Sequence, residues 1–498
     1  DLRCFYAPLK NAQKKINMQA TIDGKGLAPT LQELHMWSEA GDMNLMATGQ
    51  ADFSLSKPSW SAKVTDLTLS EAIIDYLQKN IPDIPRQLTY IGNLKVTGSA
   101  NGEPDGALTA KTHISTDIGN MGLDFFMTGT KQFRGSIETE GLDISWLTEE
   151  SQLGQLVADL NIDGQLATTV PTINVQGMVT RLDYKDYPFA NIGVNGTYSD
   201  EGIAGFLRIE DPNLKAELEG NIRNLSQGAH TIDLKGRFNH LMPQAIGLSD
   251  NWGDAVFSAN LDADLTAKDI NDAQGEVRLS NFIMKEKDGS TYALDNLYLT
   301  SGYEDRTHYV TLVSDFAKAN LKGEFEYSTL PQSIINFVGS ALPTLPGLPP
   351  VDKRSGNNFA LQLQLFKTDF LQKLLGIDVS LRQPATLSAR VNDLSKTINL
   401  EGLVPDLTYN GSRYTNGNIR ITTPSDTIKG HLTIDKLMDD GQTIGIALNA
   451  VASDNNLSTS LSWDNNNKEE KFTGNLNMTT NLYRNAATQP EAHIRVQQ

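Results

Sequence analysis

Hydrophobic and polar residues alternate along much of the chain. In residues 214–219 Leu and Ala alternate with Lys and Glu, and residues 261–265 and 361–365 repeat the pattern with other polar partners. Weaker versions occupy residues 431–435 and 475–478. Successive side chains on a strand point to opposite faces, so each segment is predicted to be a strand with one apolar and one polar face. Helix-covered parallel sheets show continuous apolar runs instead, so the pattern favours antiparallel sheet.

Turn dipeptides recur between these segments. Asp-Gly and Asn-Gly pairs tolerate the positive φ of tight hairpins, and they predict turns at several places. The pairs stand at residues 23–24, 101–102, 163–164, 195–196, 410–411 and 416–417.

A few short helices are predicted among the strands. Residues 70–80, 331–342 and 368–376 carry apolar residues at helical spacing, and a further short helix is predicted near 145–157. Helices of three turns or fewer are marginal alone, so each is expected to lie against the sheet. Residues 343–350 contain four prolines and predict a loop, because proline cannot donate to a strand ladder.

A degenerate repeat marked by tyrosines indicates an array of similar units. Residues 182–198 and 407–421 share a tyrosine-marked hairpin, and residues 292–303 hold a weaker copy. The alternative is that Tyr, Asn and Gly are simply common in hairpins. We predict segments 1–165, 166–275, 276–400 and 401–498, which together form one continuous sheet.

Composition and charge narrow the partners. The chain has 498 residues, a net charge of -18 and a single cysteine, Cys4. A polyanion repels nucleic acid, so no nucleic-acid partner is expected. One cysteine allows no internal disulfide, which fits a reducing compartment or an exported protein without bridges. No window reaches the ~18 apolar residues of a membrane span. The chain begins at Asp1, so we interpret it as part of a longer protein.

Hairpins such as Tyr-Lys-Asp-Tyr-Pro-Phe-Ala-Asn-Ile at residues 184–192 resemble those of the TamB family of translocation and assembly proteins, closest to its long Bacteroidetes-type versions. That family is similar to AsmA-like and repeating β-groove proteins. The resemblance implies a long sheet curled into a β-taco with an apolar lining. It also implies a periplasmic location, an inner-membrane anchor outside this segment, phospholipid transport, and outer-membrane biogenesis with an insertase-type barrel that contacts regions outside this segment.

Physical reasoning independently favours a curled sheet. Open twisted sheets rarely exceed ~10 strands without curling or splitting. An acyl chain on the apolar side of a curled sheet gains ~0.8 kcal/mol per buried CH₂. The alternative is that the same residues fill ordinary sandwich cores, since alternation is identical in both. The candidate lipid-lining residues are Leu214, Ala216, Leu218, Leu261, Leu265, Leu361, Leu363, Leu365, Leu432, Ile434, Leu476 and Met478.

Catalytic and metal-binding motifs have little support in the sequence. Residues 159–164 match the start of a calcium loop, but Val170 occupies the position that needs a bidentate Glu, and the segment also fits a strand. We therefore expect no enzyme, no metal and no cofactor. Three functions remain open: a groove that conducts phospholipid acyl chains, a scaffold that pairs strands with outer-membrane protein precursors, and an array of β-sandwich adhesion or carbohydrate-binding domains.

Overall fold

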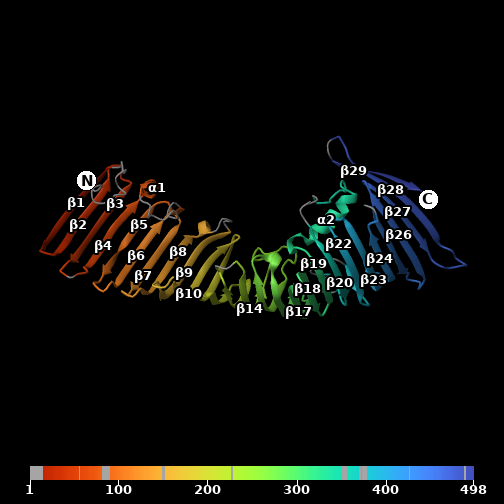
Figure 1. The fold of residues 1–498 in the computed structure, drawn as a ribbon, viewed down its shortest axis with the longest axis horizontal. Coiled ribbons are helices and arrows are strands. Elements are labelled where there is room, and N and C mark those ends of the chain that lie inside the picture. The colour runs from red at the N-terminus through yellow and green to blue at the C-terminus, as the bar shows by residue number, and fades with distance from the viewer. Residues whose placement is uncertain are drawn as a thin grey trace. The chain divides into compact units, whose positions relative to one another are not determined.

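The fold is an open antiparallel sheet of 29 strands that is not closed into a barrel (Figure 1). Strands make up 67% of the structure and helices 7%. The predicted all-β fold with a few short helices is therefore confirmed, and the β-sandwich alternative is not. The structure is a computed structural model that describes residues 15–54, 56–80, 90–147, 152–225, 228–349, 356–368, 372, 378–424, 427–486 and 489–497.

The chain divides into two compact units. Unit 1 comprises Asp1–Arg223 and Asn239–Leu248, and unit 2 comprises Asn224–Phe238 and Ser249–Gln498. The predicted segment boundaries at residues 275 and 400 fall within strands β16 (Gln274–Lys285) and β23 (Thr397–Tyr409).

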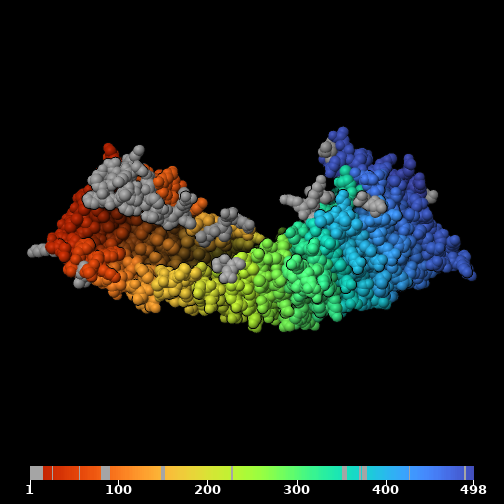
Figure 2. Space-filling model, in the orientation of Figure 1, coloured from red at the N-terminus to blue at the C-terminus, as the bar shows by residue number. Residues whose placement is uncertain are grey.

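In unit 1 the strands are β1 (Ile16–Lys25), β2 (Ala28–Ser38), β3 (Met43–Asp52), β4 (Ser59–Leu69), β5 (Leu94–Gly102), β6 (Leu108–Thr116), β7 (Gly119–Met127), β8 (Gln132–Asp143), β9 (Leu153–Gln165), β10 (Thr172–Tyr184), β11 (Tyr187–Ser199), β12 (Gly202–Glu210) and β13 (Leu214–Arg223). Each pairs antiparallel with the next along the chain. Figure 2 shows a hollow in the surface of this unit.

Strand β14 (His230–Leu241) contains residues of both units. In unit 2 the strands are β15 (Val256–Ala267), β16 (Gln274–Lys285), β17 (Thr291–Glu304), β18 (Thr307–Ser314), β19 (Ala317–Glu324), β20 (Asn358–Leu365), β21 (Val379–Leu381), β22 (Ala385–Asn392), β23 (Thr397–Tyr409), β24 (Ser412–Thr422), β25 (Ile428–Leu437), β26 (Thr443–Ser453), β27 (Asn456–Asp464), β28 (Thr473–Arg484) and β29 (Pro490–Gln497). Neighbours in the chain pair antiparallel, except that β20 pairs with β22 and the short β21 pairs with β23.

Most of the tight turns lie elsewhere than the dipeptides predict. Among the predicted pairs, Asn410–Gly411 joins β23 to β24 as expected. The pairs at 23–24, 101–102, 163–164, 195–196 and 416–417 lie inside or at the ends of strands instead. Lys185–Asp186 forms a two-residue turn with φ of 49° and 65°, values typical of a type I′ turn. Without an Asn-Gly signature, such a turn is hard to recognise in sequence.

Two of the predicted helices are confirmed. α1 (Glu71–Asn80) and α2 (Leu330–Ala341) match the predicted segments 70–80 and 331–342. The helix predicted near 145–157 is wrong. Among the described residues of this segment a 3-10 turn forms at Ser145–Leu147, and β9 begins at Leu153 because its alternating residues pair with β8 and β10. The helix predicted at 368–376 lies almost wholly outside the described residues. Residues 159–164 belong to β9, so they fit the strand interpretation.

Candidate functional site: an apolar face

The strand register decides which residues share a face. Residues directly opposite each other on paired strands point to the same side of a sheet. A chain of opposite partners, followed from strand to strand, therefore traces one row across one face. Traced within each unit separately, these rows show whether apolar side chains from successive strands meet.

In unit 2 one central row is apolar throughout. It takes one residue from each strand from β15 to β28 except β21, and every member is an aliphatic residue or glycine. The row runs through Ala263, Val277, Leu299, Leu312, Ala319, Leu363, Leu387, Gly402, Ile419, Leu432, Leu448, Leu461 and Leu476. At ~4.8 Å between neighbouring strands, this row extends for roughly 60 Å.

A parallel row lies two residues away on the same face. Its members are aliphatic, methionine or glycine, apart from Ser301 and Thr459. The row runs through Leu265, Gly275, Ser301, Val310, Leu321, Leu361, Ala389, Leu400, Ile421, Gly430, Ala450, Thr459, Met478 and Val496. We call the side that carries these two rows the apolar face of unit 2.

The nine unit 2 candidates all lie on this face. Leu363, Leu432 and Leu476 belong to the central row, and Leu265, Leu361 and Met478 to the parallel row. The other three, Leu261, Leu365 and Ile434, lie two residues from the central row on its other side, where Leu261 opposes Leu279, Leu365 opposes Ala317 and Ile434 opposes Ile446. The sequence could assign each residue to a face of its own strand, but only the register shows that the faces coincide.

Unit 1 has the same organisation. One row runs through Ala20, Leu34, Ala47, Val64, Gly98, Thr112, Leu123, Ile137, Leu160, Gly177, Val194, Leu207 and Leu218. Its neighbour runs through Met18, Met36, Leu45, Leu67, Val96, Ile114, Met121, Thr139, Ala158, Val179, Ile192, Ile209 and Ala216. They define the apolar face of unit 1. The candidates Leu218 and Ala216 end these two rows on β13, and Leu214 follows on the same face.

Polar residues occupy the opposite side. In unit 2 the row that alternates with the central row is polar at every strand, and it defines the polar face of that unit. It runs through Asp264, Glu276, Thr300, Thr311, Asn320, Gln362, Ser388, Glu401, Arg420, His431, Asn449, Ser460, Asn477 and Gln497. No charged residue stands in either row of the apolar face. In unit 2 the sheet therefore has one apolar side and one polar side.

The apolar rows are buried in some places and open in others. Ala158, Val179 and Ile192 form a buried cluster in unit 1, and Ala216 and Ala263 are also buried. Leu218, Leu363 and Leu432 are half-buried, as are Leu387 and Leu461. A sandwich core would bury such residues almost completely, because a second sheet would cover them. Thr139, which interrupts a unit 1 row, is satisfied: its hydroxyl donates to the Leu156 carbonyl (3.1 Å) and accepts from the Ala158 amide (2.9 Å). The face thus keeps accessible apolar surface and satisfies this polar group within it.

Helix α2 covers one end of the unit 2 apolar face. Ala341, at its C-terminus, and the next residue, Leu342, pack against Ala452 and Leu482. Ala452 lies two residues beyond Ala450 on β26, so it belongs to the same face. Helix α2 therefore covers the ends of the strands and leaves the central row uncovered.

An aromatic cluster that the sequence analysis missed lies near the start of α2. The His308 ring is 2% exposed and stacks between Tyr303 and Phe325, with ring centroids 4.7 and 4.4 Å away. Its Nε2 is 3.0 Å from the Ser301 hydroxyl and 3.1 Å from that of Tyr327. Burial lowers the pKa of His308. The residues come from three separate segments, so no local motif marks the cluster.

Other kinds of site find no support in the described part of the chain. No group of three or more His, Cys, Asp or Glu side chains among those residues is arranged to hold a metal ion. None of the described helices is both long and apolar enough to cross a bilayer. No family model, curated protein or solved structure matches the chain.

Proposed function

We propose that the chain is a periplasmic groove protein whose apolar face binds phospholipid acyl chains and conducts them between the inner and outer membranes, in support of outer-membrane biogenesis. The uninterrupted central row of unit 2 carries this proposal. Each buried methylene contributes about 0.8 kcal/mol, and apolar contact has no preferred direction, so an acyl chain can slide from one strand to the next. The hairpin pattern of the TamB family fits the same proposal, including its anchor outside this segment.

The matched variants Leu363→Asp and Gln362→Asp test this function. The two residues are neighbours on β20, but Leu363 faces the apolar side and Gln362 the polar side. An unpaired carboxylate beneath an acyl chain costs several kcal/mol, whereas a solvated one costs little. In a vesicle-to-vesicle transfer assay with a fluorescent phospholipid, we expect Leu363→Asp to reduce the rate at least about tenfold, the equivalent of about 1.4 kcal/mol.

Circular dichroism of both variants controls for folding. If a folded Leu363→Asp variant transfers lipid at the wild-type rate, or if Gln362→Asp is equally impaired, the proposal fails.

A second candidate, strand pairing with outer-membrane protein precursors, is favoured by one observation. Within the described residues β29 pairs only with β28, and all eight of its residues are exposed. Ile494 and Val496 are 58% and 56% exposed. Such an edge can accept an added strand through backbone hydrogen bonds. This function predicts that Leu363→Asp has no effect on precursor capture, which separates it from lipid transport.

A further inference from the structure

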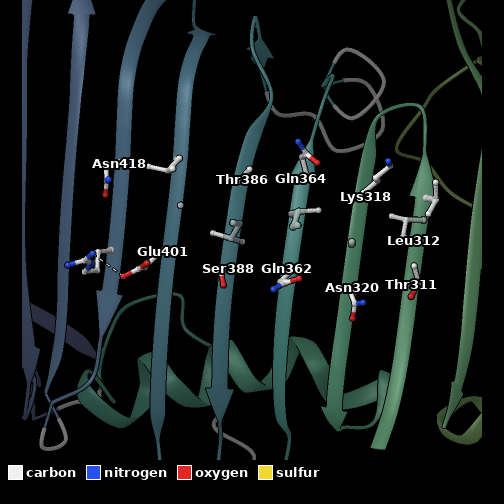
Figure 3. A pocket seen from close by; sticks show the side chains of 17 residues that line it. Thr311, Leu312, Lys318, Asn320, Gln362, Gln364, Thr386, Ser388, Glu401 and Asn418 are labelled. Atoms are coloured by element: carbon white, nitrogen blue, oxygen red, sulfur yellow. Dashed lines mark ion pairs between the residues drawn. The ribbon is translucent and has the colours of Figure 1, made fainter. Parts of the chain in front are cut away.

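A hollow of about 640 Å³ lies over unit 2, spanning strands β18, β19, β20, β22, β23 and β24 (Figure 3). Its lining includes five residues of the central row, Leu312, Ala319, Leu363, Leu387 and Gly402, and on each of those strands it also includes the polar-face residue on either side. On β24 it includes Asn418 and Arg420 but not Ile419 between them. Asn418 and Arg420 point away from the central apolar row, so the hollow lies on the polar face. Its polar side chains therefore project from the side of the sheet opposite the proposed lipid-binding surface.

Two neighbouring rows of side chains line the hollow. Several of these side chains end in amides and others carry hydroxyls. Glu401 and Arg420 carry the charges of one ion pair, and Lys318 carries a further positive charge. The first row holds Thr311, Asn320, Gln362, Ser388, Glu401 and Arg420, and the second holds Val313, Lys318, Gln364, Thr386, Leu403 and Asn418.

The amide side chains in the hollow have unpaired hydrogen-bond donors and acceptors. Among the residues that the structure describes, none provides a hydrogen-bond partner for the side chains of Asn320, Gln362, Gln364 or Asn418. Figure 3 shows Asn320 beside Gln362 and Gln364 on adjacent strands, the hydroxyls of Ser388 and Thr386 on the next strand, and Asn418 beyond Glu401. Each amide offers both donors and an acceptor, so together they can recognise a partner that both donates and accepts.

Apolar side chains on the same face add a second kind of contact. Leu403 is 53% exposed and Val313 is 41% exposed, although both stand on the polar face. They lie in the same row, on either side of Gln364 and Thr386. The hollow thus presents amides and hydroxyls between two exposed aliphatic patches.

We propose that this hollow binds a neutral, hydroxyl-rich chain, an oligosaccharide. Sugar hydroxyls donate and accept hydrogen bonds as amide side chains do, and the C–H faces of sugar rings can pack on Leu403 and Val313. The six strands span roughly 24 Å at ~4.8 Å per step, room for several sugar units. The site does not depend on the lipid function, because it uses the opposite face of the sheet.

Other polymers fit this hollow less well. Glu401 and Arg420 neutralise each other at 3.0 Å, which leaves Lys318 as a single positive charge among the lining residues named above, and the net charge of -18 disfavours polyanions. A peptide gains most of its affinity for a sheet from backbone pairing at an edge, and the strands here already pair on both sides. The face of the sheet offers only side chains, which suits a ligand recognised through its hydroxyls.

The proposal is tested by isothermal titration of the full chain with two neutral probes, the β-1,4-linked hexamer of N-acetylglucosamine and maltoheptaose. We expect at least one probe to bind with a Kd in the millimolar range or tighter. Gln362→Ala should weaken binding about tenfold, and Ser388→Trp, which fills the hollow, should abolish it. Ser458→Trp places the same ring on the polar face of β27, outside the hollow, and should leave binding unchanged.

Circular dichroism confirms that the variants are folded, and Gln362→Ala keeps the test valid if Ser388→Trp does not fold. Failure of the wild-type chain to bind either probe would overturn the proposal. Equal loss in Ser458→Trp would also overturn it. Binding of an unstructured Gly-Ser peptide in place of the sugars, blocked by Ser388→Trp, would instead assign the hollow to peptides.

Discussion

The buried carboxylate of Asp211 makes a quantitative prediction about how the tyrosine-marked hairpin of unit 1 is held. Asp211 is 1% exposed and lies between β12 and β13. It accepts hydrogen bonds from the Tyr187 hydroxyl at 2.6 Å, the Ala190 amide at 3.0 Å and the Asn213 amide at 2.8 Å. One side chain thus connects β11 to the turn that opens β13.

The expected loss follows from these contacts. A hydrogen bond to a charged group contributes about 1.5–3 kcal/mol, and a buried donor left unsatisfied costs about 1–3 kcal/mol. Because the three donors share one acceptor, the free energies of their hydrogen bonds do not add fully. We therefore expect Asp211→Ala to destabilise this region by about 4 kcal/mol. Tyr187→Phe removes one contact and should cost about 1.5 kcal/mol. In the double mutant Asp211→Ala/Tyr187→Phe, the Tyr187→Phe change should lower the stability by less than it does in the wild-type chain.

Hydrogen exchange followed by mass spectrometry measures this effect locally. In a sheet where each strand contacts only its neighbours, the loss should appear as faster exchange in β10–β13 while β4–β6 stay protected. Asp200→Ala, in the exposed β11–β12 turn, is the control and should change stability by less than about 0.5 kcal/mol. Unchanged exchange in Asp211→Ala, or equal acceleration in β4–β6, would refute the reasoning.

Three further predictions concern unit 2. Arg413→Ala removes the guanidinium that pairs with the buried Asp406 carboxylate at 2.7 Å, so thermal unfolding should show a loss of about 2 kcal/mol. Burial lowers the pKa of His308 in the folded protein. The stability that depends on the neutral ring is therefore present above the unfolded pKa of about 6.5 and is lost as the pH falls below that value. Hydrogen exchange near α2 should accelerate in acid, and His308→Gln should remove this pH dependence. Gly474→Ala would place a Cβ in steric conflict with the ring of Trp463 on β27 and should cost about 1–3 kcal/mol in chemical denaturation. Gly430→Ala, with its nearest contact at 3.9 Å, should be close to neutral.

Alternation fixed the faces of single strands because it depends on local chemistry alone. Leu361, Leu363 and Leu365 share a side of β20 whatever β20 pairs with. Their alignment with Leu432 or Leu476 depends on register, and register depends on the turns. Two-residue turns such as Lys185–Asp186 carry no Asn-Gly signature, so the rows became visible only in the structure.

Two features could not be predicted correctly from the sequence: the side-chain clusters formed by distant segments, and the absence of the predicted helix from residue 153 onward. The Ser301, His308 and Tyr327 side chains meet because β17, β18 and the turn before α2 converge, and none of these residues signals the others. The helix predicted near 145–157 failed because residues from Leu153 onward gain more from pairing with two strands than from one helical turn. The candidate lining residues could be predicted from periodicity alone. The hollow on the polar face could not, because it forms only when six strands lie in register.

Photo-crosslinking tests the central claim most directly. A benzophenone amino acid placed at Leu432 projects from the apolar face, and one placed at the adjacent His431 projects from the polar face of the same strand. After incubation of the full chain with phospholipid vesicles, the account predicts lipid adducts at Leu432 and few at His431. Adducts at His431 in equal or greater amount, or none at Leu432 in a folded protein, would contradict the account.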